Sequence, residues 1–487
     1  MGNEKHEYKK DYLQSLLKSI KGKTLEEIGG ERFFELVRDN PKITGIYGTI
    51  IEQCVLNYPP NSSKDPDLIV DDVECELKTT GLRKNEQDGV EKYVPKEPVT
   101  ITGVSIPTIV KEDFFYYSHF WRKIQNLLFV FYEYKSKTTV SSLGYKDFPV
   151  IGHMFLTFSR EDTEILRKDW ELVRNYLRKS KEGPEPEKMY SLLYPNLCKD
   201  LNFLDTSPRY PNPPRFRFKR SFFSTILEKH FHPDKYEVLD DSYTGISDFD
   251  HQCHISTERY KGKSFRDLIK IFNIEDHSIS KQTSEQFVVK MFEGKSKKIN
   301  NLEVFNKFSV VGKTITLNPK GGKTEDTKLF TIDFEEIKDP TLEFEDSEFY
   351  SYFTQKFLFI IFQEPVKDSP LLDNIFIGFK RYSFSLDFVD TYVRKLWETI
   401  RDLVNNGRLK ETICCDKDNN PIINETGVFR TKLNFPKSSD KQFLFVRGTG
   451  RNSSKKTLIL NNIKMYDQQV WVRGLDIVDI LSREQFL

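Results

Sequence analysis

Three carboxylates and a lysine near the start of the chain have the types and the spacing of a metal-dependent hydrolytic site. Asp67 follows a proline, Glu76 and Lys78 form a Glu-x-Lys pair, and Glu52 ends an apolar segment upstream. Mg²⁺ prefers oxygen ligands and is usually held by one or two carboxylates, which leaves positions for water and a phosphate oxygen. A nearby lysine can orient or deprotonate the attacking water. We therefore expect phosphodiester hydrolysis, with Asp67 and Glu76 as primary metal ligands, Glu52 as a third carboxylate and Lys78 as the catalytic lysine.

The elements that must position these residues are a strand and a short helix. Successive side chains of a strand alternate between its faces, so Glu76 and Lys78 point the same way. The alternate positions, which we expect to face the core, are Val73, Cys75 and Leu77. The segment before Glu52 predicts a helix whose apolar side is formed by Ile46, Tyr47, Ile50 and Ile51. An Asp…Glu-x-Lys pattern also arises by chance in a chain that is 30% charged, but a helix, a turn and a strand in one short segment favour a nuclease.

These motifs resemble the MutH family of endonucleases, which comprises the mismatch-repair nicking enzyme and related type II restriction enzymes that cut at GATC. The matching motifs are Gly45-x-x-Gly48-x-x-x-Glu52, Pro66-Asp67 and Val73-x-x-Glu76-Leu77-Lys78-Thr79. A further segment, Phe120-Trp121-Arg122-Lys123-Ile124 before the apolar run 127–133, resembles the family's helix with a second active-site lysine. The resemblance covers about residues 15 to 232. It implies a catalytic role for Lys123, Mg²⁺ as the cofactor, double-stranded DNA as the substrate, and a cognate methyltransferase that protects host DNA.

The composition indicates a globular chain in which any DNA-binding surface is local. The net charge is +1 and aromatic residues make up 14% of 487 residues, which is typical of folded domains rather than of a DNA-coating protein. One basic segment includes Arg215, Arg217 and Lys219, which we expect to bind DNA, and another is Arg447–Lys456. No run approaches the ~18 apolar residues of a membrane span, and the polar start is unlike a signal peptide. Six cysteines without a Cys-x-x-Cys pattern predict a reduced, cytoplasmic protein.

The second half of the chain repeats the order of motifs found in the first. The first two pairs are Lys21–Glu27 with Lys261–Asp267, and Leu128–Tyr132 with Leu358–Phe362. The next two pairs are Arg167–Glu171 with Arg394–Glu398, and Phe216–Leu227 with Val470–Leu481. Segments that keep their order while the loops between them change in length indicate a duplicated domain.

The second copy lacks the catalytic side chains. Glu76-Leu77-Lys78-Thr79 falls on Val311-Gly312-Lys313-Thr314, Lys123 falls on Phe353, and Asp67 falls on Leu302. A copy without these carboxylates cannot hold Mg²⁺ in the same way, so we expect it to be catalytically silent. It carries the segment Phe445–Ser453, which resembles the family's base-reading loop and in which Arg447 and Arg451 suit guanine and Asn452 suits adenine. The alternative is a plain glycine-rich hairpin turn.

We therefore predict an α/β protein with two tandem restriction-endonuclease-like domains, each a mixed sheet with flanking helices. Residues 1–232 form the catalytic domain, residues 233–258 a linker, and residues 259–487 a DNA-binding and allosteric domain. The predicted activity is Mg²⁺-dependent type II restriction cleavage at GATC by a DNA-induced dimer or a two-site complex. One alternative is a mismatch-repair strand-nicking endonuclease, which the duplicated half argues against because the repair enzyme resembles a single copy. The other is a non-cleaving sequence-specific DNA-binding protein, which the Glu76/Lys78 pair argues against.

Overall fold

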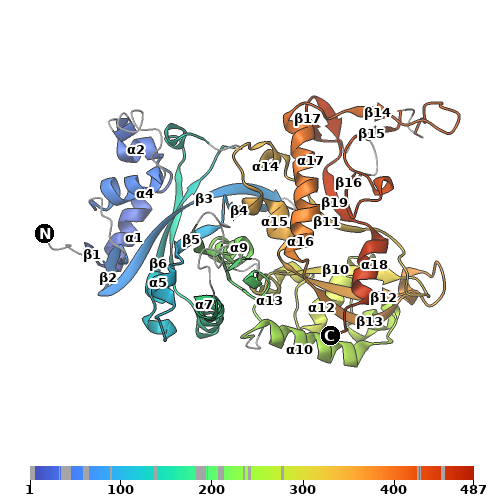
Figure 1. Cartoon of the computed structure of the whole chain (residues 1–487), viewed down its shortest axis with the longest axis horizontal. Helices are drawn as coiled ribbons and strands as arrows, with labels where there is room; N and C mark the ends of the chain where they lie inside the picture. Colours follow the sequence, from blue (N-terminus) through green and yellow to red (C-terminus); the bar gives the residue numbers. More distant parts are fainter. Residues whose placement is uncertain are drawn as a thin grey trace. The chain divides into compact units, whose positions relative to one another are not determined.

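The computed structural model divides the chain into two compact units (Figure 1). The first unit comprises Met1–Phe249 and Gly294–Val310, and the second comprises Asp250–Glu293 and Val311–Leu487. The division at Phe249 lies inside the predicted linker 233–258, which also contains the start of helix α10 (Ile246–Tyr260). The structure describes residues 6–31, 33–34, 45–58, 65–87, 90–136, 140–181, 193–194, 196–206, 213–233, 236–239, 243–275, 279–424, 427, 429–450 and 456–487.

The first unit is built on a mixed sheet with the strand order β1-β2-β3-β6-β7, and β4 also pairs with β3. β1 is parallel to β2 and β3 is parallel to β6, whereas the other neighbours are antiparallel. The predicted buried strand is confirmed as β6, because all of its residues except the last are apolar and buried. The strands are β1 (His6–Tyr8), β2 (Leu68–Val70), β3 (Val73–Gln87), β4 (Val90–Pro95), β6 (Leu127–Glu133) and β7 (Val150–Leu156).

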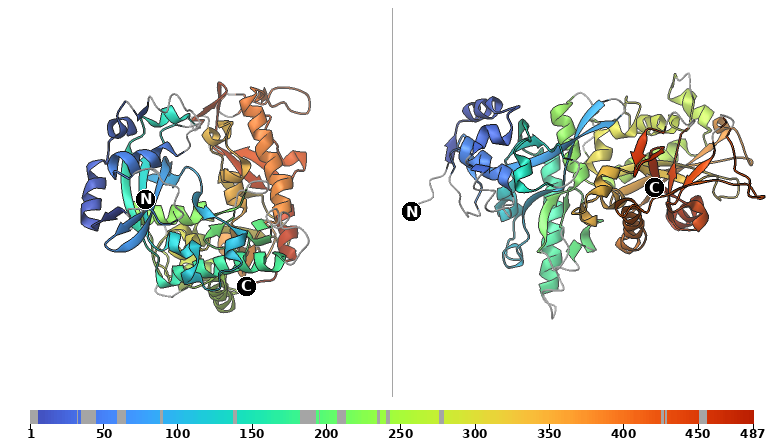
Figure 2. Two further views of the ribbon diagram at one scale, coloured as in Figure 1. Left: turned by 60° about the vertical axis from the view of Figure 1, so that its left-hand side comes forward. Right: turned by 90° about the horizontal axis from the view of Figure 1, so that it is seen from above.

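Helices lie on both faces of this sheet. Figure 1 shows α1, α2 and α4 on one side and α9 on the other, and the two views of Figure 2 agree. The predicted apolar side of α4 is confirmed, since Ile46, Tyr47, Ile50 and Ile51 are all buried. The helices are α1 (Lys10–Ser19), α2 (Leu25–Gly29), α4 (Ile46–Ile50), α5 (Ile106–Ile109), α6 (His119–Ile124), α7 (Arg160–Lys181), α9 (Arg220–Phe231) and α13 (Glu303–Lys307). A separate small sheet has the order β5-β9-β8 and consists of β5 (Val99–Gly103), β9 (Arg215–Phe218) and β8 (Leu204–Asp205).

The second unit contains two three-stranded sheets and two short hairpins. One sheet has the order β10-β12-β13 and the other β11-β19-β16. Their strands are β10 (Val310–Leu317), β12 (Lys356–Gln363), β13 (Ile375–Tyr382), β11 (Thr327–Thr331), β19 (Gln468–Val472) and β16 (Leu444–Gly448). The hairpins pair β14 (Glu411–Ile413) with β15 (Thr431–Leu433), and β17 (Leu458–Leu460) with β18 (Ile463–Met465). The helices are α10, α11 (Phe265–Ile271), α12 (Thr283–Met291), α14 (Phe334–Lys338), α15 (Glu348–Phe353), α16 (Leu386–Phe388), α17 (Arg394–Asn405) and α18 (Gly474–Ser482).

The two units share their internal construction. The order β3-β6-β7 corresponds to β10-β12-β13, and β5-β9-β8 corresponds to β11-β19-β16. The small sheets even carry an irregularity at the same place, after Thr100 in the first unit and after Lys328 in the second. Gly22 (φ 86°) and Gly262 (φ 84°) both have a left-handed backbone conformation. The N–H of Gly22 donates to the carbonyl of Val150 in β7, and the N–H of Gly262 donates to the carbonyl of Phe376 in β13, the corresponding strand. These matches support the predicted duplication, while the assignment of the second unit to the restriction-endonuclease fold stays a prediction.

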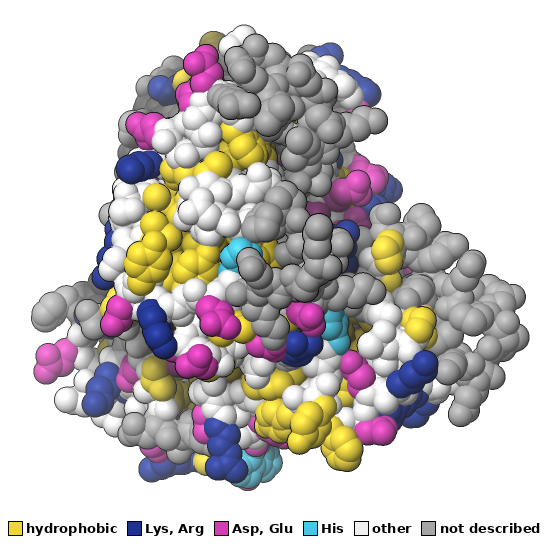
Figure 3. Space-filling model, turned by 90° about the vertical axis from the view of Figure 1, so that its left-hand side faces the viewer, with side chains coloured by type: hydrophobic (Ala, Val, Ile, Leu, Met, Phe, Trp, Pro, Cys, Tyr) yellow, Lys and Arg dark blue, Asp and Glu magenta, His cyan; other side chains and the backbone are white. Residues whose placement is uncertain are grey.

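The surface of the first unit carries both signs of charge. Figure 3 shows Lys and Arg side chains interspersed with Asp and Glu on the face turned to the viewer, in line with the net charge of +1. In the described part of the chain, no helix is both long enough and apolar enough to cross a membrane. All six cysteines are free thiols.

Candidate active site

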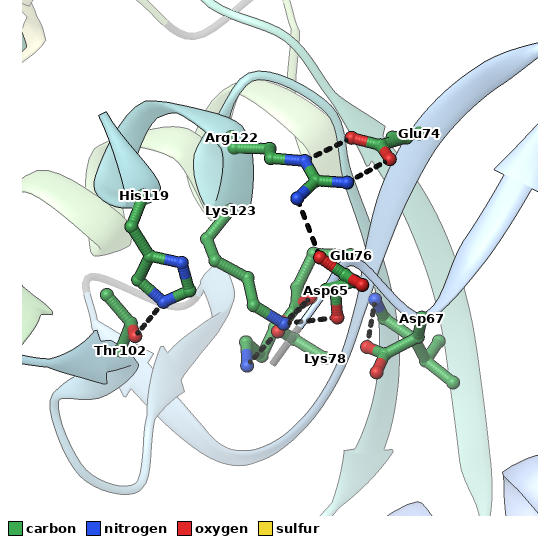
Figure 4. Close-up of polar contacts among 10 residues, drawn as sticks. Asp65, Asp67, Glu74, Glu76, Lys78, Thr102, His119, Arg122 and Lys123 are labelled. Atoms are coloured by element: carbon green, nitrogen blue, oxygen red, sulfur yellow. Dashed lines mark hydrogen bonds and ion pairs between the residues drawn. The ribbon is translucent and has the colours of Figure 1, made fainter. Parts of the chain in front are cut away.

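A two-residue turn between β2 and β3 sets the register of the site. Asp71 and Asp72 both have positive φ, at 47° and 65°, as a type I′ hairpin requires. The pairing that follows from this turn ends at Leu68 with Cys75, so Asp67 and Glu76 are the next residues beyond that pair. The backbone N–H of Leu77 donates to Oδ2 of Asp67 over 3.0 Å and holds the carboxylate in place (Figure 4). The turn therefore brings two of the predicted metal ligands together.

Glu76 is the centre of the polar cluster. It is only 3% exposed, and its two carboxylate oxygens accept from Nζ of Lys78 and Nζ of Lys123, each over 2.7 Å. Lys123 comes from α6 and also donates to the main-chain carbonyl of Asp65 over 2.7 Å (Figure 4). Two ammonium groups on one carboxylate compensate its burial, which would be costly without a partner. The predicted common face of Glu76 and Lys78 is confirmed, and the structure adds Lys123 to it.

The opposite face of β3 follows the prediction with one exception. Cys75 and Leu77 are buried, at 3% and 6% exposure, whereas Val73 is 48% exposed. Val73 is the first residue of the strand, directly after the turn, so the prediction that it faces the core is wrong for a local reason. Alternation places a side chain on a face, but at a strand end no core covers that face.

Arg122 closes the outer side of the cluster and was not predicted. Its Nε and Nη2 donate to the two oxygens of Glu74 over 2.7 and 2.5 Å, and its Nη1 donates to Oδ1 of Asp65 over 2.6 Å. These contacts tie α6 to β3 and to the acidic turn before β2 (Figure 4). A signal for them exists in the sequence, since Glu74 lies two residues before Glu76 and so shares its strand face, and Arg122 is adjacent to Lys123.

Glu52 lies in the π-helical turn η1 (Ile51–Val55) that continues α4. Such turns are rare and are often found at functional sites. Burial raises the pKa of Glu52 to about 7; the carboxylates of Asp67 and Glu76 add to the effect, and Lys78 opposes it. Glu52 therefore interacts electrostatically with the other two acids.

Asp67 experiences the same excess of negative charge. The pKa of Asp67 is raised to about 6. Burial is the largest cause and the Glu76 carboxylate also raises it, whereas the Leu77 N–H and the two lysines lower it. Three carboxylates against two lysines leave a formal charge of −1, which a divalent cation would relieve, and carboxylate oxygens are the ligands that Mg²⁺ prefers. The donor set thus suits Mg²⁺ by its chemistry. The predicted three-ligand arrangement of Glu52, Asp67 and Glu76 is not assembled, because no group of three or more Asp, Glu, His or Cys side chains in the described residues is close enough to hold a metal ion.

Comparison with known proteins finds two similarities, one to the segment that contains these residues and one to most of the chain. Residues 56–169, which contain Asp67, Glu76, Lys78 and Lys123, match the family model for the DNA mismatch repair enzyme MutH. The type II restriction enzyme Sau3AI of Staphylococcus aureus is 25% identical over 419 residues, which cover 80% of this chain and 78% of that enzyme. The chain is therefore similar to MutH over part of its first unit and to a type II restriction enzyme over most of its length. Since 80% of the chain exceeds either unit alone, the likeness to Sau3AI extends into both units.

The three residues of the first unit that were predicted to contact DNA differ in exposure and in hydrogen-bond partners. Arg215 is exposed on β9. Arg217 is 7% exposed and its Nε donates to Oδ1 of Asp205 over 3.1 Å. Nζ of Lys219 donates to two main-chain carbonyls, over 3.2 and 2.5 Å. These internal contacts support structural roles for Arg217 and Lys219 and leave Arg215 as the candidate that is presented to solvent.

The predicted base-reading loop of the second unit is described only in part. Arg447 lies in β16, its Nη2 donates to Oδ2 of Asp326 over 2.8 Å, and its guanidinium lies over the rings of Phe445 and Trp471. Arg451 and Asn452 lie outside the described residues. The DNA-binding role of this loop stays a prediction.

Proposed function

We propose that this chain is a Mg²⁺-dependent type II restriction endonuclease that hydrolyses double-stranded DNA at GATC. The observation that carries the proposal is the buried Glu76 with Lys78 and Lys123 on its two oxygens and Asp67 close to it. The similarity to MutH and to Sau3AI supports the reaction class. GATC is the recognition sequence that the resemblance to this family implies, and a cognate methyltransferase would protect host DNA.

Each residue of the cluster has a role in this proposal. Asp67 and Glu76 would hold the metal ion, and Glu52 adds the negative charge of a third carboxylate near them. When bound, Mg²⁺ lowers the pKa of a coordinated water and neutralises charge on the phosphate. Lys78 is partly exposed and is placed to orient the attacking water or to accept its proton. Lys123 is buried against Glu76, so its charge is fixed in position to stabilise the additional negative charge of the transition state.

The proposal assigns DNA binding and stimulation of cleavage to the second unit. It shares the order of the core strands with the first unit but has Val311 and Tyr352 where that unit has Glu76 and Lys123. Binding of one site there would raise the local concentration of another site at the catalytic unit. One catalytic set cuts one strand, so a double-strand break requires two active units, as in a DNA-induced dimer or two-site complex, or two successive events.

A plasmid digest tests the proposal. Plasmids with known GATC sites, methylated and unmethylated, are incubated with the protein in Mg²⁺ or in EDTA, with Glu76→Ala as the inactive control. We expect linear fragments that end at GATC in Mg²⁺ and none in EDTA. Nicked circles alone would support a strand-nicking enzyme of the mismatch-repair type, and specific binding without any cleavage would support a non-cleaving DNA-binding protein.

A further inference from the structure

The second unit keeps a cleft at the position that corresponds to the active site of the first. A cavity of about 430 Å³ is lined by β10, β11 and the start of α12. The hydroxyl oxygens of Ser284 on α12 and Thr314 on β10 are 2.7 Å apart. In the first unit, Gly48 of α4 packs against Thr79 of β3, and a Cβ on Gly48 would lie 3.4 Å from Oγ1 of Thr79. Since Thr314 is the counterpart of Thr79, α12 occupies the place of α4.

This correspondence shows which catalytic groups the second unit has lost. Aligning Ser284 with Gly48 places Val288 where the first unit has Glu52. Together with the strand and helix matches, Glu52, Glu76 and Lys123 are replaced by Val288, Val311 and Tyr352, whereas Lys78 persists as Lys313. The second cleft has therefore kept one lysine and lost the carboxylate that holds it.

The charge of the cleft is reversed as a result. In the first unit, Glu52, Asp67 and Glu76 against Lys78 and Lys123 give −1, and adding Arg122 with its two acceptors Glu74 and Asp65 makes the whole cluster −2. The lining of the second cleft gives +1, because it contains four lysines and three acids, namely Lys281, Lys313, Lys323, Lys328, Glu285, Glu325 and Asp326. A cation complements the first site and an anion complements the second. The start of α12, a helix of nine residues, adds the positive end of its dipole to the same cavity.

Lys313 is the group in this cleft that an anion would stabilise most. Its Nζ donates to the main-chain carbonyl of Leu329 over 2.7 Å, in place of the carboxylate contact that Lys78 has. The ring of Tyr352 lies 5.8 Å from the ammonium. An ammonium group has three donors, so a phosphate oxygen can be added to these contacts. The pKa of Lys313 is lowered to about 8. Burial is the largest cause and Lys328 also lowers it, whereas Glu285 raises it.

We propose that this cleft binds a backbone phosphate of DNA directly through Lys313, without a bridging metal ion. The inference rests on the proposed DNA binding by the second unit, and it adds the site of contact and its independence from Mg²⁺. The hydroxyl groups of Ser284 and Thr314 offer further donors at the same cavity wall.

The test uses the full-length chain and a labelled duplex with one GATC site. Binding is measured by fluorescence anisotropy in EDTA, where cleavage is not expected, over a range of salt concentrations. The variants are Lys313→Met and Lys313→Arg, and the matched control is Lys380→Met, a lysine of the second unit whose Nζ also donates to a main-chain carbonyl over 2.7 Å but which does not line the cavity. Melting temperatures establish that each variant is folded.

We expect wild type to bind in EDTA and Lys313→Met to bind about tenfold more weakly, with the salt slope reduced by about one, as for loss of one phosphate contact. Lys313→Arg keeps the slope, and Lys380→Met leaves binding in EDTA unchanged. Equal affinity and slope for wild type and Lys313→Met would overturn the inference, as would DNA binding that requires Mg²⁺.

Two further outcomes are distinguishable. If wild type cleaves GATC but binding does not depend on Lys313, the inference fails while the proposed function stands. If wild type neither binds nor cleaves DNA, the proposed function itself fails. A separate arm tests free anion: if millimolar inorganic phosphate raises the melting temperature of wild type but not of Lys313→Met, and DNA binding is independent of Lys313, the cleft is a free-phosphate site and the assignment to DNA is overturned.

Discussion

At the scale of single residues, Glu76 carries the largest share of the proposed chemistry. Glu76→Ala removes a metal ligand and the common acceptor of Lys78 and Lys123, so we expect cleavage to be abolished. Asp67→Ala and Lys78→Ala are expected to have the same effect. DNA affinity should stay within about tenfold of wild type, because contacts to the phosphate backbone supply most of it. Plasmid cleavage and anisotropy measure the two effects, with Glu76→Gln as a variant of equal size. Near-normal cleavage by Glu76→Ala would refute the assignment.

Lys123 is predicted to act on the reaction rather than on folding. The structure corrects the expected match to Phe353: Lys123 is the fifth residue of α6, and the fifth residue of α15 is Tyr352, so this helix does not need a lysine to form. Lys123→Ala should lower the single-turnover rate by ~10²-fold or more, which is the usual scale for a positioned electrostatic group. Lys123→Met, which keeps most of the side-chain volume, should be equally slow while it melts at a temperature close to that of wild type. A variant that retains most of its rate would exclude Lys123 from the catalytic set.

The crowded carboxylates predict a trade-off between stability and function at Asp67. Its pKa of about 6 in the folded state lies above the ordinary value of 3.8, so folding favours the protonated form. The carboxyl group therefore contributes most to stability at low pH, and this contribution is lost as the pH rises through 6. Above that pH the ionised form costs about 3 kcal/mol. Asp67→Asn, which can still accept from the Leu77 N–H, should abolish cleavage yet raise the melting temperature in EDTA above pH 7.

The pH dependence provides the control for that prediction. The difference in melting temperature between Asp67→Asn and wild type should shrink as the pH falls from 7 towards 4, because wild type then becomes protonated at Asp67. A difference that is independent of pH would show that the stabilisation has another origin. A destabilised Asp67→Asn protein at every pH would contradict the charge argument.

At the scale of elements, the hairpin turn between β2 and β3 determines whether two acids meet. Asp72 has a φ of 65°, a conformation that glycine adopts freely and that a β-branched residue strongly disfavours. Asp72→Gly should therefore keep stability and cleavage. Asp72→Val should cost about 1 to 2 kcal/mol and lower the cleavage rate, because a shift of register moves Asp67 away from Glu76. Chemical denaturation and plasmid cleavage of the pair test this. Equal behaviour of the two variants would mean that the turn does not control the register.

The elements also show what could be predicted from the sequence and why the rest could not. Periodicity placed Glu76 and Lys78 on one face and predicted β6 correctly, because alternation and apolar runs are local properties. Periodicity could not predict that Arg215 is exposed while Arg217 is buried. Arg217 is buried against Asp205 on the neighbouring strand, and the sequence does not show that pairing. The contacts of Arg122 were missed for the same reason. They join segments that are far apart in the sequence.

At the scale of the whole molecule, the two units differ in the sign of charge at matching positions. The cluster around Glu76 has a net negative formal charge and the lining of the cavity around Lys313 has +1, and both are built on the same order of strands. A unit that keeps this strand order without the carboxylates would be released from catalysis but not from binding, as we propose for the second unit. Residues 294–310 belong to the first unit although they lie between segments of the second. A cut at residue 258 would therefore remove part of the first unit, and the role of the second unit is best tested in the full-length chain.

If the second unit binds the same sequence and stimulates the first, cleavage must depend on the number of sites. We expect a plasmid with two GATC sites to be cut faster than a plasmid with one, because the sites share a high effective concentration on one molecule. Adding a short GATC duplex in trans should accelerate the one-site plasmid, and a duplex of scrambled sequence should not. Lys313→Met should reduce this acceleration. Equal rates on the two plasmids, with no effect of the added duplex, would leave the second unit with a purely structural role.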